Sequence, residues 1–177
     1  EDALSVKETE LATLRRIGTS EHNILDVQGN LAVTYAKLER HELALQMKRI
    51  VYFGYLKLKG EEHADTLISA NNYADSLIQL QRYKTVMSVL RKTLPIARRV
   101  LGENHHLTLR MRFNYARALH QDPAATLDDR RESVTTLEDA ERTARRVFGG
   151  AHPFVEQVEH FLRESRGLLH KKRKTSG

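Results

Sequence analysis

The feature that most constrains this sequence is an internal repeat. Three glycines recur every 42 residues, and three asparagines keep the same spacing, at Gly18, Gly60 and Gly102 and at Asn30, Asn72 and Asn114. A fourth copy starts at Gly149, after a gap of 47 residues. A fixed period of this length is typical of stacked supersecondary units that bury their apolar faces only against their neighbours. The sequence therefore predicts a solenoid.

Each copy has the pattern of two helices. In the second copy, residues 67–80 and 86–101 place apolar side chains at intervals of three and four, with a short break at Gln81 and Arg82. Gly102 suits the left-handed position that ends a helix, and Pro95 predicts a bend inside the second helix of the pair. No stretch alternates as a strand would. We therefore predict an all-α chain of antiparallel helix pairs.

The residues that follow each glycine resemble a known repeat. The second copy reads Gly-Glu-x-His at residues 60–63, then Thr-Leu at 66–67 and Asn-Asn-Tyr-Ala at 71–74, and the third copy is similar. This pattern resembles the tetratricopeptide repeats of kinesin light chain and its relatives, over roughly residues 18–167. The resemblance implies an α-solenoid, a right-handed superhelix of about three and a half repeats. The Pro expected after the repeat histidine is present only at Pro153.

We expect a single repeat domain over residues 1–177, within a longer protein. Residues 1–17 are interpreted as the second helix of a preceding repeat, 18–59, 60–101 and 102–148 as repeats, 149–170 as a C-terminal capping helix, and 171–177 as a basic tail. The five additional residues of the third copy fall at 120–126, as a longer loop or as an extra helical turn starting at Pro123. The open N-terminal end is expected to be a site of self-association, since terminal repeats normally shield such faces.

Composition and motifs argue against an enzyme. There is no cysteine, no apolar run long enough for a membrane span, no glycine-rich phosphate loop and no serine in a nucleophile elbow. The repeat histidines, His63, His105, His106 and His152, are a whole unit apart and are expected to cap helices rather than to bind metal. We expect no catalytic residue, cofactor or metal, and an intracellular, cytoplasmic protein.

The repeated asparagines are the best indication of function. On a helical wheel Asn72 lies opposite the apolar face, so the first helices of the pairs are expected to line a concave groove that binds a peptide or a partner helix. An Asn side chain has a donor and an acceptor for peptide backbone, and the family resemblance implies the same use. The alternative is that each Asn bonds a neighbouring helix and fixes the stacking. The predicted peptide-binding residues are Asn30, Lys37, Asn71, Asn72, Asp75, Gln79, Arg110, Asn114 and Arg117.

Charge suggests which ligand the groove would select. The residues beside each repeated Asn on its helix face form a stripe, and Arg110 and Arg117 make the third stripe basic. This favours a ligand with acidic residues, because Arg can hold a carboxylate through two contacts. The alternative for each Arg is ordinary solvated charge.

Nucleic-acid or anionic-surface binding is the alternative function. The net charge is +6, and Lys171, Lys172, Arg173 and Lys174 supply four of these charges. The pairs Arg15-Arg16, Arg98-Arg99 and Arg145-Arg146 fall at predicted helix ends, where the helix dipole favours cations whatever the ligand. The Lys171–Lys174 run is interpreted as a nuclear-entry signal, an anionic-surface contact or a soluble end.

Overall fold

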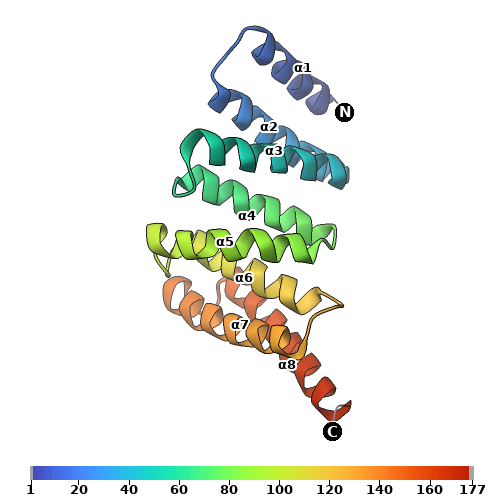
Figure 1. Ribbon diagram of the computed structural model, residues 1–177, viewed down its shortest axis with the longest axis vertical. Helices are drawn as coiled ribbons and strands as arrows, with labels where there is room; N and C mark the ends of the chain where they lie inside the picture. The colour runs from blue at the N-terminus through green and yellow to red at the C-terminus, as the bar shows by residue number, and fades with distance from the viewer. Residues whose placement is uncertain (1, 176–177) are drawn as a thin grey trace. The chain divides into compact units, whose positions relative to one another are not determined.

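The computed structural model describes residues 2–175 of the chain, and side chains within residues 3–170. This described part forms eight α-helices and contains no strand, so the all-α prediction is confirmed (Figure 1). In chain order the helices are α1 (Asp2–Arg16), α2 (Glu21–Lys37), α3 (His41–Lys59), α4 (Ala64–Gln79), α5 (Tyr83–Leu101), α6 (His106–Gln121), α7 (Leu127–Phe148) and α8 (Pro153–Thr175).

The helices form two compact units, the first ending at Leu80 and the second beginning at Gln81. The division falls within the second predicted repeat, residues 60–101, so α4 belongs to the first unit and α5 to the second. In a solenoid each helix packs only on its neighbours, so that a segment of a few helices has a core of its own.

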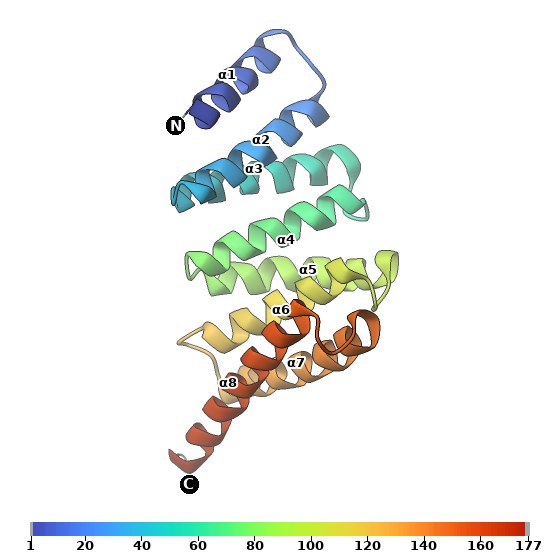
Figure 2. The same cartoon turned by 180° about the vertical axis from the view of Figure 1, so that it is seen from behind.

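In the first unit, each helix packs on the one before it. α1 contacts α2, α2 contacts α3, and α3 contacts α4. Figures 1 and 2, taken from opposite sides, show these helices following one another side by side. Their buried residues include Leu4, Leu11, Val27, Leu31, Tyr35 and Ala44. The predicted helix over residues 1–17 corresponds to α1, whose Glu8 accepts a 2.6 Å hydrogen bond from the Tyr35 hydroxyl.

In the second unit, α6 is the central helix. It packs against α5 and α7, while α8 packs against α7 and also contacts α6. The shared core is aliphatic and aromatic, and includes Leu109, Phe113, Val134, Leu137, Val155, Val158 and Leu162. Because α8 contacts both helices of the third repeat, it closes the core of this unit at its C-terminal side.

The predicted helix ends are largely confirmed. Gly102 has φ 92°, in the left-handed region, and its N–H donates to the carbonyl of Arg98 at 3.0 Å. α5 runs through Pro95 without a break, so this proline is not a helix boundary. α8 continues to Thr175, beyond the predicted end at residue 170. The side chains of Lys171–Lys174 lie outside the described residues, and none of the described helices is long and apolar enough to cross a membrane.

Histidines cap three of the helices, as the sequence predicted. The Nδ1 atoms of His63, His105 and His152 accept hydrogen bonds of 3.2, 3.2 and 3.1 Å from backbone N–H groups two residues later. The prediction was wrong for His106, which is the first residue of α6, because His105 already occupies the N-cap position.

The five additional residues of the third copy are divided between a loop and a helix. The α6–α7 loop spans residues 122–126, and α7 has 22 residues against 19 in α5. Thr126 caps α7 by accepting from the N–H of Asp129 at 3.1 Å, and the Asp129 carboxylate accepts the Thr126 N–H at 2.9 Å. The added turn therefore begins at Leu127, and Pro123 stays in the loop.

Candidate functional site

The predicted polar stripes of the first unit are largely at the surface. Asn30 and Lys37 on α2 are exposed, as are Asn72 and Gln79 on α4, while Asp75 is half-buried. These residues are positioned by their helices. Both α2 and α4 pack on α3, and the residues named above lie on α2 and α4. These residues meet the geometric requirement for contact with a ligand.

A small groove lies between these helices. It has a volume of about 140 Å³ and is lined by Gly29 and Val33 of α2, Lys48 and Val51 of α3, and Ser69 and Asn72 of α4. We call these six residues the α2/α4 groove. Val33 is 49% exposed, so the groove offers an apolar wall beside the amide of Asn72. Of the predicted site residues, Asn72 alone lines it.

Lys48 is the charged group of this groove. Its Nζ donates a 2.6 Å hydrogen bond to Ser76 Oγ on α4, and its side chain is half-buried. Burial lowers the pKa of Lys48, and the nearby Asp75 opposes this shift in part. An ammonium has three donors, and the bond to Ser76 uses one of them. The site can therefore donate to a carbonyl or carboxylate group of a ligand.

Two predicted contact residues, Asn71 and Asn114, are instead buried. Asn71 is 7% exposed and Asn114 is 6% exposed, and each has an interaction partner within the protein. Consecutive residues of a helix point about 100° apart, which is why Asn71 is buried while its neighbour Asn72 is exposed. Asn71 and Asn114 therefore lie in the protein interior, whereas Asn30 and Asn72 are exposed.

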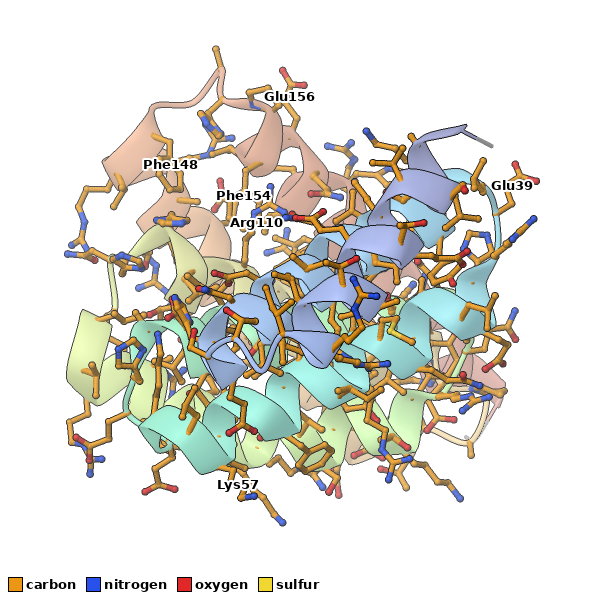
Figure 3. The ribbon with its side chains drawn as sticks, turned by 90° about the horizontal axis from the view of Figure 1, so that it is seen from above. Glu39, Lys57, Arg110, Phe148, Phe154 and Glu156 are labelled. Atoms are coloured by element: carbon orange, nitrogen blue, oxygen red, sulfur yellow. The ribbon has the colours of Figure 1, made fainter. Side chains whose placement is uncertain are left out.

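The burial of Asn114 follows from the way α8 packs on α6. The Arg110 guanidinium lies 6.0 Å from the Phe154 ring centre, and that of Arg117 lies 5.6 Å from the Phe161 ring centre. Figure 3 shows Arg110 next to Phe154. These contacts lie about one turn on either side of Asn114. The third stripe is thus partly covered by α8, although Arg110 itself is exposed.

Sequence reasoning missed Lys48, although the repeat contains the signal for it. Lys48 stands twelve residues before Gly60, and the residues twelve before Gly102 and Gly149 are Leu90 and Leu137. Both leucines are fully buried, at 0% exposure. A basic residue at an otherwise apolar position of the repeat indicates a local departure from simple packing.

The geometry gives no indication of metal or covalent chemistry. Among the described residues, no three His, Asp or Glu side chains come together as a metal site would require. His63, His105 and His152 act as caps, and the α2/α4 groove contains an amide, a hydroxyl, an amine and aliphatic groups. Such groups suit hydrogen bonding and apolar contact.

Comparison with known proteins finds a similar repeat. Residues 66–107 match the model of the tetratricopeptide repeat. This segment is similar to a tetratricopeptide repeat. Tetratricopeptide repeats are helix pairs that stack on their neighbours, as the helices of this chain do within each unit.

Solved structures show that the chain has the fold of TPR-like repeat solenoids. Two crystal structures from Podosopora anserina, both described as nearly identical TPR-like repeats, match 98% of this chain and 80% of theirs, with TM-scores of 0.79 and 0.77 and 20% identity. BtubC (BKLC) from P. vanneervenii matches with a TM-score of 0.61 and 14% identity, over 98% of this chain and 71% of its own. No curated protein sequence matches the chain.

Proposed function

We propose that this protein is a non-catalytic scaffold of tetratricopeptide-like repeats that holds an extended segment of a partner protein in the α2/α4 groove. One observation carries the proposal: the exposed amide of Asn72 and the ammonium of Lys48 line the same groove as the exposed Val33 side chain. An extended peptide presents backbone donors, backbone acceptors and side chains together, and the groove offers a partner for each of them.

Each group of the groove has a distinct part in this proposal. The Asn72 amide pairs with the peptide backbone and so needs no particular side chain. Lys48 donates to a peptide carbonyl or to an acidic side chain, and Val33 contacts an apolar side chain. Asn30, Lys37, Asp75 and Gln79 would extend the surface along α2 and α4.

A preference for acidic partners rests on fewer residues than the sequence suggested. In the second unit, the exposed Arg110 remains the candidate contact for an acidic side chain of the partner. Arg117 is half-buried against α8, which makes it a weaker candidate. Neither residue lines the α2/α4 groove, so the groove and the charge preference can be tested separately.

The test is a selection of random peptides on the purified protein at physiological salt, followed by affinity measurements on the enriched sequence. Two variants remove the central groups of the groove: Asn72→Ala and Lys48→Leu. The second introduces the residue type found at Leu90 and Leu137, so we expect the fold to tolerate it. Each variant should weaken peptide binding about tenfold, the usual effect of losing one hydrogen bond to a charged or well-aligned partner.

Gln46→Ala is the matched control, because Gln46 is exposed on α3 and does not line the groove. It should bind the peptide as the parent protein does. Equal affinity of the parent, Asn72→Ala and Lys48→Leu for the enriched peptide would refute the groove assignment. A labelled oligonucleotide is tested in parallel with and without residues 171–177. Oligonucleotide binding with no peptide enrichment would favour the nucleic-acid alternative.

A further inference from the structure

A second, larger cavity lies in the second unit, between α5, α6 and α7. Its volume is about 580 Å³. Four arginines line it: Arg98 near the end of α5, Arg112 on α6, and Arg142 and Arg146 on α7. We call it the Arg112 cavity. None of its lining residues belongs to the α2/α4 groove.

Arg112 is buried at the base of this cavity and its hydrogen bonding is incomplete. Its side chain is 6% exposed, and its two terminal nitrogens lie 3.6 Å from Glu103 Oε2 and 3.9 Å from Asp139 Oδ2. Both distances exceed that of a normal hydrogen bond. Its Nε is buried and, among the described residues, has no hydrogen-bond partner. Burial, with a further contribution from Arg98, lowers the pKa of Arg112.

The repeat shows that the fold does not require a guanidinium at this position. Arg112 is the tenth residue after Gly102, and the tenth residue after Gly60 is Ala70, which is fully buried. An alanine at this position is therefore compatible with the helix-pair packing. Burying a charge without full pairing costs stability, so Arg112 is better explained by a ligand than by packing.

Positive charge is in excess inside the Arg112 cavity. The four arginines face two carboxylates, both already paired: Glu103 with Arg98 at 3.2 Å and Asp139 with Arg142 at 2.6 Å. Arg146 donates to the neutral side chain of Asn104 at 2.7 Å. The lining therefore carries a net charge of +2, and the buried Arg112 shares Glu103 and Asp139 with Arg98 and Arg142 instead of having a carboxylate of its own.

We propose that the Arg112 cavity binds the phosphate group of a phosphorylated serine or threonine of a partner protein. A phosphate monoester carries close to two negative charges at neutral pH and three acceptor oxygens, which matches the two excess charges and the donors of Arg112 and Arg146. Glu103 and Asp139 interrupt the basic lining, so the arginines do not form the continuous basic track that a polynucleotide backbone needs, and this favours a single phosphate on a polypeptide. The proposal is independent of the α2/α4 groove.

The first experiment measures binding of inorganic phosphate by the thermal shift of the purified chain and by the Nε–Hε NMR signals of arginine. The second selects phosphoserine and phosphothreonine peptides from a library and compares each with its unphosphorylated form. Arg112→Ala, which introduces the residue type of Ala70, should weaken phosphopeptide binding about 10- to 100-fold, the usual effect of losing a charged hydrogen bond. Arg146→Ala, at an exposed position where folding is not at risk, should weaken it in the same direction.

Arg163→Ala is the matched control, since it removes the same charge from an exposed position on α8 outside the cavity. It should bind the phosphopeptide as the parent protein does. Equal losses in Arg163→Ala and Arg112→Ala would overturn the proposal, because the attraction would then be nonspecific. Equal affinity for phosphorylated and unphosphorylated peptides would also overturn it. So would a selection that yields no phosphopeptide while the chain binds inorganic phosphate or an oligonucleotide through Arg112.

Discussion

A close contact between α2 and α3 gives a sharp test of the geometry that supports the α2/α4 groove. Gly54 of α3 faces Leu25 of α2, a side chain that is 3% exposed. A Cβ added at Gly54 would lie within 3.0 Å of Leu25 Cδ1 and 3.3 Å of its Cγ, with Cδ2 closer still. Leu25 is packed with Val51 and Tyr55, so it has little room to move away.

The expected effect of Gly54→Ala is the difference between two terms. Alanine is favoured over glycine inside a helix by about 1 kcal/mol, whereas overpacking a core typically costs about 1–3 kcal/mol. The variant should therefore lower the free energy of unfolding by about 0–2 kcal/mol. Gly29→Ala on α2 is the matched control, because nothing lies within 4 Å of its added Cβ. It should raise the free energy of unfolding by about 0.5–1 kcal/mol.

Urea unfolding followed by circular dichroism measures both variants, and the second comparison uses a Leu25→Ala background. Removing the Leu25 side chain opens the space, so Gly54→Ala should become favourable there, with a coupling free energy of about 1–3 kcal/mol. If Gly54→Ala stabilises the parent protein as much as Gly29→Ala does, the close contact between α2 and α3 is refuted. The shape of the groove above it would then need revision.

Three further predictions follow from named contacts. Asn114→Ala should lower the free energy of unfolding by about 1–3 kcal/mol in urea titrations, because it removes a buried polar side chain. Asn72→Ala, at an exposed position, should change it by less than about 0.5 kcal/mol, and equal effects of the two variants would contradict their different burial. Burial, with a smaller effect of the adjacent His106 imidazole, lowers the pKa of His105 below its ordinary value of 6.5. As the pH drops below about 6.5, His105 is therefore protonated first in the unfolded chain, and the stability of the folded protein should fall. His105→Asn, which keeps a capping side chain, should reduce that loss. Tyr115→Phe removes the 2.8 Å bond to Glu132 and the 3.0 Å bond from Arg91, and should cost about 1–2 kcal/mol in the same assay.

The helix pairs could be predicted from the sequence because their signals are local. The left-handed glycines, the capping histidines and the three- and four-residue apolar spacing each act within about one turn of helix. Gly102 ends α5 and His105 caps α6 as predicted. His106 was misassigned because only one residue can occupy an N-cap, and the sequence offered two adjacent histidines.

The candidate site could be predicted only in part, because burial depends on contacts between helices distant in sequence. Asn30, Asn72 and Asn114 occupy the same place in the repeat, yet only Asn114 is buried. The difference arises because α8, with its rings at Phe154 and Phe161, packs along α6. A repeat period shows which positions are equivalent, but not which neighbour covers each of them.

Lys48 and Arg112 suggest a physical reason for specialisation within a repeated fold. The equivalent positions hold Leu90 and Ala70 at 0% exposure, so the helix-pair packing is satisfied by apolar side chains there. A buried basic group lowers stability unless it is fully paired, and Arg112 is not. If both residues served only packing, replacing them by leucine and alanine would destabilise the protein. If they serve ligands, the same replacements should preserve or raise the free energy of unfolding while weakening ligand binding. A variant that is at least as stable as the parent protein but binds its ligand more weakly therefore separates the two explanations.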